Sequence, residues 1–455
     1  MCNFKTLLIA TLIILSSYYG CNHLSVSKQP KNIIFMISDG WSYNHILATD
    51  YYQYGKTNVQ TYQAFPFQSA MSTFMAGGVY EPDSALASFD YVKKKPTDSA
   101  ASATALSTGK KTYNGAICVD TEQKPLENIV QRAEKLGKAT GVVTSVLWNH
   151  ATPAGMVAHD TNRNNYVEIA IEMIYNSGLE VIMGCGHPFY DDNAKPVTPD
   201  ENFKHIAAVW SDLVAGKEGN DANNDGIIDY WTLIQDSIDF VKLMDGDTPK
   251  RVIGVPKART TLQYMRSGQT TGQGPSAPNT TDPPYTDAYN KGVPTLEQMT
   301  IGALNVLDND EDGFFLMVEG GAVDWASHGN TTARMIEEQI DFNKSVDVVF
   351  RWVNQNSSWD ETLVIVTGDH ECGYLTGPHS DPTWEPVRNN GIGNLPGTQW
   401  NSGSHTNQLI PLYAKGPGIQ LLHQYADEYD IKKGHYLQNS EVGQAMFTLW
   451  TNPIQ

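Results

Sequence analysis

The sequence predicts an α/β fold with a mostly parallel central sheet, flanked by helices on both faces. Short apolar runs rich in β-branched residues recur along the chain, and helical patterns fall between them. A long stretch rich in Gly, Pro, Asn and Asp, residues 186–295, is expected to form a loop-rich insertion or cap. We therefore expect a single α/β domain over residues 31–455.

Five apolar runs are expected to be buried strands. They are KNIIFMIS (31–38), KATGVVTSV (138–146), EVIMGC (180–185), GFFLMVEG (313–320) and ETLVIVTGDH (361–370). Three of them deliver an acid at or just after their ends, namely Asp39, Glu319 and Asp369. Because sites in such sheets lie beyond the carboxyl ends of the strands, we expect these acids to share one site.

Three segments between these runs have the apolar spacing of helices. They are LENIVQRAEKLG (126–137), NYVEIAIEMIYNSG (165–178) and TARMIEEQIDFNKSVDVVFRWVNQ (332–355). The 455-residue chain has 31 Lys and Arg against 50 Asp and Glu, a formal charge of −19. This excess of acids argues against a nucleic-acid-binding surface.

The first residues have the features of an export signal. Lys5 precedes the ten-residue apolar run TLLIATLIIL, which is too short to span a bilayer. SSYYGC then ends in Cys21, which resembles a bacterial lipoprotein signal, although Tyr18 is unusual in that pattern. Residues 1–20 are thus expected to be a signal peptide. Cys21 would anchor a periplasmic or outer-membrane protein through a lipid, and plain secretion is the alternative.

The other cysteines, Cys118, Cys185 and Cys372, are odd in number and widely spaced. Such a set predicts buried free thiols rather than a disulfide framework.

The stretch DANNDGIID (221–229) matches the first half of a calcium loop, with Asp221, Asn223 and Asp225 as ligands. Its twelfth position is Thr232 instead of the bidentate Glu. A calcium site and a solvated turn both remain open. The first would suit a second class of function, a surface-anchored calcium-binding structural protein.

Several His and carboxylate residues have the spacing of metal ligands. Asp324 and His328 lie four residues apart, so a helical turn would place both on one face. Asp369 and His370 directly follow an apolar run, and His405 lies in SGSHTNQ. Mixed His and carboxylate ligands suit zinc, whereas Glu with a hydroxyl suits magnesium. With the other strand-end acids, the set could hold two zinc ions and one harder ion.

The segment 93–116, KKKPTDSAASATALSTGKKTYNGA, contains almost no large apolar residues. Ser99 follows Asp98 at a predicted helix N-terminus, where free N–H groups favour an anion. A serine hydroxyl needs a base or a metal to become a nucleophile, and the metal ligands could supply one. The alternative is an Asp98 N-cap on a tightly packed helix of small residues.

PTDSAASATALSTGKKTYNGAI resembles the nucleophile motif of alkaline phosphatases, and further motifs follow in that family's order over residues 31–418. The resemblance implies hydrolysis of phosphate monoesters through a phosphoserine at Ser99, with two Zn²⁺ and one Mg²⁺. In HATPAGMVAHDTNRNNY it implies that Arg163 binds the phosphate, with Asp98 orienting it. It also implies a homodimer, with a monomer as the alternative.

The same resemblance implies the metal ligands. The first zinc would take Asp324, His328 and His405; the second Asp369, His370 and Asp39; and the magnesium Asp39, Thr152 and Glu319. His150 stands where the best-known bacterial pattern has an aspartate near the magnesium, so we expect a weaker or altered third metal. Trp325 stands where lysine or histidine is often found.

Two related classes of enzyme fit less well. Sulfatases need a modified Cys or Ser in a Cys/Ser-x-Pro-x-Arg context, which TDSAAS lacks. Phosphodiesterases of this type usually use threonine and have no arginine placed like Arg163. The sequence therefore favours a monoesterase.

Overall fold

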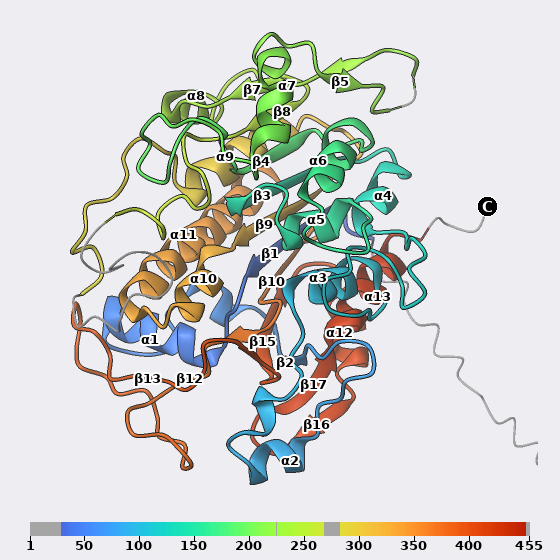
Figure 1. Cartoon of the computed structure of the whole chain (residues 1–455). Coiled ribbons are helices and arrows are strands. Elements are labelled where there is room, and N and C mark those ends of the chain that lie inside the picture. The colour runs from blue at the N-terminus through green and yellow to red at the C-terminus, as the bar shows by residue number, and fades with distance from the viewer. Residues whose placement is uncertain (1–28, 224, 268–282, 452–455) are drawn as a thin grey trace, which may run out of the picture.

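The computed structural model describes residues 29–223, 225–267 and 283–451 (Figure 1). The predicted signal peptide and Cys21 lie outside the described residues. Every helix in the described part of the chain is too short or too polar to cross a membrane.

In the described residues, eleven strands form one twisted central sheet (Figure 1). Neighbouring strands pair in parallel except at β15 and β16, which run antiparallel to their neighbours. The strand order is β16 (Glu428–Asp430), β17 (Gly434–Gln438), β2 (Phe67–Ser72), β15 (Ile410–Lys415), β10 (Thr362–Thr367), β1 (Asn32–Ser38), β9 (Phe314–Gly320), β3 (Ala139–Leu147), β4 (Val181–Cys185), β8 (Val252–Gly254) and β7 (Thr232–Ile234).

The five predicted strands are β1, β3, β4, β9 and β10, and they occupy consecutive positions in the middle of the sheet. Their apolar runs lack alternation because helices cover both faces. In β1, Ile33 and Phe35 belong to one hydrophobic cluster, whereas Ile34 and Met36 belong to the other. The predicted fold class is confirmed.

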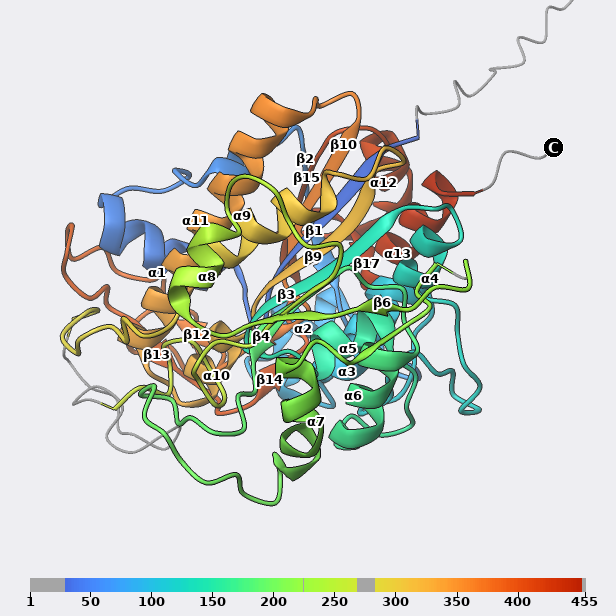
Figure 2. The ribbon, with the colours of Figure 1, turned by 90° about the horizontal axis from the view of Figure 1, so that it is seen from above.

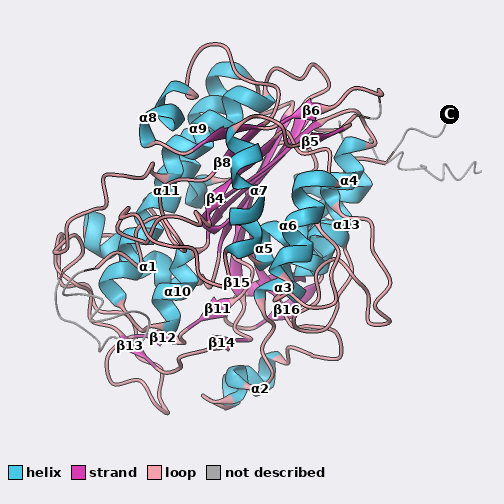
Figure 3. Ribbon diagram, turned by 45° about the horizontal axis from the view of Figure 1, so that its top comes forward, coloured by secondary structure: helices cyan, strands magenta, loops and turns pink. Residues whose placement is uncertain are grey.

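Helices cover the two faces of the sheet in separate layers (Figures 2 and 3). One layer contains α3 (Ser99–Thr108), α4 (Ile129–Glu134), α5 (Ala151–Val157), α6 (Tyr166–Tyr175), α7 (Lys204–Val214), α12 (Ile419–Tyr425) and α13 (Asn439–Leu449). The other contains α1 (Tyr43–Tyr54), α8 (Ser237–Lys242), α9 (Leu296–Leu307) and α11 (Thr332–Asn356). The predicted helices correspond to α4, α6 and α11.

The segment 186–295 has more regular structure than its composition suggests. It contains α7 and α8, and its strands β7 and β8 extend the central sheet beyond β4. A short ribbon of β5 (Gly219–Asn220) and β6 (Asp229–Tyr230) also lies within it. We call residues 186–295 the cap segment below, and its status as an insertion in one domain stays a prediction.

Candidate active site and metal centre

Helix α3 places Ser99 at the carboxyl edge of the sheet. Asp98 caps the helix, because its Oδ1 accepts a hydrogen bond from the Ala101 N–H at 2.9 Å. All ten residues of α3 are buried, and a Cβ at Gly155 would lie 2.6 Å from the Cβ of Ala103. Small residues therefore let α3 pack closely against α5. Ser99 can therefore be a nucleophile at the start of a helix that is also tightly packed.

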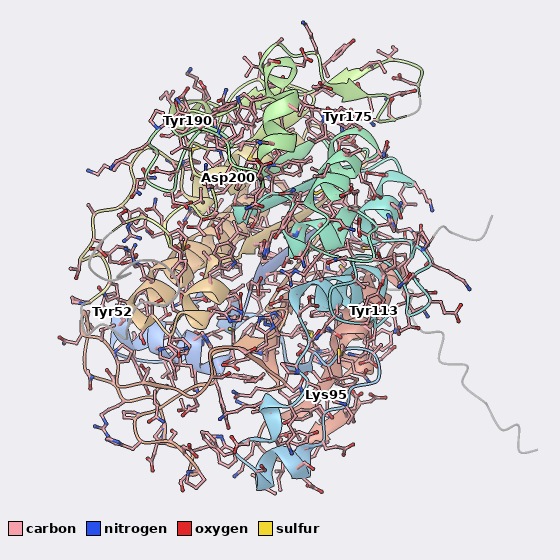
Figure 4. The ribbon with its side chains drawn as sticks, viewed as in Figure 1. Tyr52, Lys95, Tyr113, Tyr175, Tyr190 and Asp200 are labelled. Atoms are coloured by element: carbon pink, nitrogen blue, oxygen red, sulfur yellow. The ribbon has the colours of Figure 1, made fainter. Side chains whose placement is uncertain are left out.

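Ser99 is 2% exposed, and its Oγ lies 3.2 Å from the His370 Nε2. The segment that carries it, between the labelled Lys95 and Tyr113, lies in front of the sheet in Figure 4. The hydroxyl thus points at a predicted metal ligand and not into the hydrophobic core.

Arg163 is held on both sides of its guanidinium. Its Nη1 donates to the Asp98 Oδ2 at 3.1 Å, and its Nη2 lies 3.3 Å from the His150 Nε2. The same Asp98 oxygen also accepts the Gly115 N–H at 3.0 Å. Burial and the Arg163 charge lower the pKa of His150 to about 3, so the ring is neutral and can accept from Arg163.

Asp324, His328 and His405 converge at one point. The two histidine Nε2 atoms lie 3.0 Å apart, and each lies 3.4 Å from an Asp324 oxygen. Asp324 and His328 share α10 (Ala322–His328), as their spacing predicts. The His328 Nδ1 bonds to the Gly403 carbonyl and the His405 Nδ1 to the Thr97 carbonyl, each at 2.8 Å. This leaves both Nε2 lone pairs facing the same space, as a metal requires.

A second cluster of possible metal ligands consists of Asp39, Asp369 and His370. The His370 Nε2 lies 3.1 Å from the Asp369 Oδ2 and 3.6 Å from the Asp39 Oδ1. The Asp369 Oδ1 accepts N–H bonds from Gly40 at 3.1 Å and from His370 at 2.8 Å. The backbone turns sharply after β10, so these neighbouring residues can both face the site.

Gly40 makes the turn after β1 possible. Its φ is +70°, and a Cβ there would lie 2.6 Å from the Asp324 Cα. Only glycine allows Asp39 to approach α10 this closely.

Thr152 and Glu319 lie on α5 and β9, and both are fully buried. Thr144, which no sequence motif indicated, donates a hydrogen bond to the Glu319 Oε2. Burial raises the pKa of Glu319 to about 7.

The predicted ligands include many buried oxygen atoms with no hydrogen-bond partner among the described residues. Most buried polar atoms are paired, so such a cluster needs an explanation. Burial, followed by the charges of neighbouring carboxylates, raises the pKa of Asp39 well above its usual range. Cations would relieve both problems, and the donor set therefore fits metals. The unpartnered atoms are both carboxylate oxygens of Asp39, the Thr152 Oγ1, the Glu319 Oε1, the Asp324 Oδ1 and the Asp369 Oδ2.

Cys372 is a second residue that no sequence motif assigned to the site. Its sulfur and donor atoms of Asp324, His328 and His405 all lie within 4.8 Å of one another. Cys372 pairs with His405 across the ribbon of β11 (Glu371–Cys372) and β14 (His405–Thr406). The sequence feature that could have identified Cys372 is its position two residues after His370 in TGDHEC. Cys118, Cys185 and Cys372 are all buried free thiols, as predicted.

A cavity of about 320 Å³ opens over these groups, and we call it the reaction pocket. The half-buried Trp325 lies beside His150, with ring centroids 5.8 Å apart. The pocket is lined by Ser99, His150, Arg163, Asp324, Trp325, His328 and His405.

The predicted calcium loop forms an exposed turn. The Asp221 carboxylate accepts the N–H groups of Asp225 and Gly226, each at 2.9 Å, and the Asn223 amide bonds to Asp225. These bonds suit the solvated-turn interpretation, and calcium binding stays a prediction.

The chain resembles known proteins over most of its length. The family model for alkaline phosphatase matches residues 30–394. Alkaline phosphatase 3 of Bacillus subtilis is 27% identical, covering 89% of this chain and 87% of that protein. The Escherichia coli alkaline phosphatase is 28% identical, covering 90% and 86%.

Solved structures of alkaline phosphatases also match the fold of this chain. The alkaline phosphatase from the Antarctic bacterium TAB5 has a TM-score of 0.62 and 25% identity, covering 93% of this chain and 100% of that one. A TAB5 variant with a histidine replaced by aspartate holds Mg in a site named M3 and aligns with a TM-score of 0.61 and 25% identity, covering 93% and 98%. With its matching fold and metal-ligand clusters, this chain belongs to the alkaline phosphatase family and is a phosphoric monoester hydrolase.

Proposed function

We propose that the protein hydrolyses phosphate monoesters through a phosphoserine on Ser99. One observation carries this: Ser99 and Arg163 line the same small cavity as His328 and His405 of the first cluster, and the Ser99 Oγ lies 3.2 Å from the His370 Nε2 of the second. Ser99 also begins a helix of ten residues, whose N-terminal dipole favours a phosphate dianion.

We assign zinc to the two clusters that contain histidine and magnesium to the oxygen-only cluster. When bound, these ions polarise the phosphoryl group and stabilise charge on the attacking and leaving oxygens. The ligands would be Asp324, His328 and His405 for the first zinc, Asp39, Asp369 and His370 for the second, and Asp39, Thr152 and Glu319 for magnesium.

The TAB5 variant supports the magnesium assignment. It carries aspartate in place of one histidine and holds Mg in its M3 site. His150 is a neutral histidine on the segment that carries Thr152, and we propose that it weakens magnesium binding in this chain.

The side chains divide the reaction between them. Arg163, oriented by Asp98, binds two phosphate oxygens and holds phosphorus in line with the Ser99 Oγ. The bond from the Ser99 Oγ to phosphorus forms as the ester bond breaks. The Ser99 proton passes to solvent, and the leaving oxygen takes a proton from solvent and departs as an alcohol. A water oxygen then attacks phosphorus, the Ser99–phosphorus bond breaks, and Ser99 regains its proton as inorganic phosphate leaves.

Rates on a nitrophenyl phosphate monoester and on its diester test the activity. We expect faster hydrolysis of the monoester, and loss of activity after thorough chelation with recovery on adding Zn²⁺ and Mg²⁺. Faster diester turnover, or full activity without metal, would overturn the proposal.

Labelling with ³²P-phosphate at acidic pH, followed by denaturation, tests the intermediate. We expect label on the wild type and none on Ser99→Ala, whose kcat/KM should fall by about a thousandfold. Ser102→Ala is the matched control on the same helix, because Ser102 donates to the Asp369 carbonyl and does not line the pocket. Label that persists in Ser99→Ala would exclude Ser99 as the acceptor.

We also propose that the protein is exported and anchored by a lipid on Cys21, and that it forms homodimers. The short apolar run before Cys21 supports export. Detergent-phase partitioning of the wild type and of Cys21→Ser tests the anchor, and sedimentation tests the dimer. A calcium titration of the wild type and Asp221→Asn tests the loop at 221–229.

A further inference from the structure

A second cavity, of about 490 Å³, lies where the cap segment meets the main sheet. We call it the side groove. One wall comes from the chain around the start of α6, including Asn149, Asn164 and Tyr166, and the other comes from the cap segment, including Asn202, Phe203 and Thr260. Asp200, labelled in Figure 4, marks the position of the cap wall in front of the sheet.

The side groove adjoins the reaction pocket along two stretches of chain. Asn149 precedes His150 and Asn164 follows Arg163, and consecutive Cα atoms are only about 3.8 Å apart. The side groove therefore lies next to the residues that would bind the phosphate of an ester.

The polar groups of the side groove suit hydroxyl groups. Asn149 is 1% exposed; its Nδ2 donates to the Tyr166 carbonyl at 3.0 Å, while its Oδ1 is buried without a partner among the described residues. A bound polar group or water is the usual explanation for such an atom. The side-chain amides of Asn164 and Asn202 are exposed, and each can donate and accept hydrogen bonds.

Negative charge at the rim of the side groove indicates which class of ligand it can bind. Glu168 and Glu201 both line the side groove and are exposed. Both carboxylates can accept hydrogen bonds from hydroxyls. Because Glu201 is paired with the Lys204 ammonium, Glu168 is the main charge that would repel a second phosphate. The aromatic side chain of Tyr166 adds a surface for the apolar face of a ring. These features favour a neutral, hydroxylated ring over a second anionic group.

We propose that the side groove binds the sugar ring of a phosphorylated sugar, either a hexose phosphate or the ribose of a nucleoside monophosphate. The inference rests on the proposed phosphomonoesterase activity and adds its substrate class. It gives the cap segment a role, since one wall of the side groove comes from it.

Specificity constants for glucose 6-phosphate, adenosine 5′-monophosphate and propyl phosphate test this. We expect the wild type to prefer at least one sugar ester over propyl phosphate, and the better ester identifies the ring. Removing one neutral hydrogen bond in Asn202→Ala or Asn164→Ala should reduce that preference by about five- to tenfold. Asn354→Ala, at the far end of α11, is the matched control and should keep the preference.

Binding to the Ser99→Ala variant separates recognition from turnover. By calorimetry, we expect the sugar ester to bind more tightly than inorganic phosphate, and Asn202→Ala in that background to weaken only the sugar ester. Equal wild-type rates on all three esters, or equal losses for all three in Asn202→Ala, would overturn the inference. If the wild type hydrolyses no monoester, the proposed function itself fails.

Discussion

His150 is uncharged, although it lies near the proposed magnesium ligands, where a negative charge would attract the ion. It caps α5, two residues before Thr152, and its low pKa keeps the ring uncharged at every working pH. It therefore adds no electrostatic attraction for a divalent cation near Glu319.

We predict that His150→Asp tightens magnesium binding by about tenfold or more, because a carboxylate in the outer shell attracts and orders the hydrated ion. The Mg²⁺ concentration that gives half-maximal activation measures this. His150→Asn removes the ring without adding charge and serves as the control. Equal Mg²⁺ dependence in the two variants would show that charge at this position is unimportant.

Gly40 gives a second prediction at the scale of one residue. Gly40→Ala should lower the free energy of unfolding by several kcal/mol and displace Asp39, because the new Cβ meets both a positive φ and the Asp324 backbone. Chemical denaturation and metal content measure the two effects.

Gly77→Ala is the matched control, since Gly77 has a φ of +75° but a Cβ added there would have nothing within 4 Å. It should show only the cost of the backbone conformation, about 1 kcal/mol. Equal losses in the two variants would contradict the close approach of Gly40 to α10.

At the scale of elements, the β11–β14 ribbon joins the two clusters of proposed metal ligands that contain histidine. The ribbon has only two residues on each strand, and Glu371 faces Thr406 across it. The Thr406 hydroxyl donates to the Glu371 Oε2, while the Leu375 N–H donates to the Oε1 at 3.1 Å. This buried pair fixes the position of His405 relative to His370.

We predict that Glu371→Gln and Thr406→Val each speed the loss of metal to a chelator, because His405 loses its support. The double variant should lose metal no faster than the worse single variant, since both remove one interaction. Stopped-flow release of zinc measures the rates.

Thr140→Val is a suitable control for this pair. Thr140 is a buried strand residue whose hydroxyl lacks a partner among the described residues, so the change removes no hydrogen bond. Faster metal loss in this control would point to a general packing effect.

The central strands could be predicted from the sequence. Helices cover both of their faces, so their residues form continuous apolar runs that are easy to identify. β2 was missed because FQSAMS mixes polar and apolar residues, and β15 because IPLYAK contains a proline, which argues against a strand. Residues near the metals followed family motifs, whereas Cys372 and Thr144 depend on strand register and tertiary contacts, which a single sequence does not show.

At the scale of the whole molecule, Glu180 lies at the amino end of β4, opposite the site. Burial raises the pKa of this carboxyl to about 8, although its Oε2 accepts the Thr140 N–H at 2.7 Å. A carboxyl with a raised folded-state pKa stabilises the fold below its unfolded pKa. That stability is lost as the pH rises toward the folded pKa.

We therefore predict that the contribution of Glu180 to stability falls between about pH 4.5 and about pH 8. In Glu180→Gln this decline should be absent. Between pH 5 and pH 8, the free energy of unfolding of the wild type should therefore fall by a few kcal/mol more than that of the variant. Urea unfolding at a series of pH values measures it. Parallel stability curves for the two proteins would show that Glu180 ionises freely in the folded state.

The position of β1 has a consequence for how the chain matures. Ile33 is among the first described residues, yet it pairs with Phe315 on one side and Leu363 on the other. During synthesis, the first strand must wait for most of the chain before either neighbour exists. Folding is slow when partners are so distant in sequence. Asp39 and Asp369, which follow β1 and β10, therefore cannot meet until most of the chain has been synthesised.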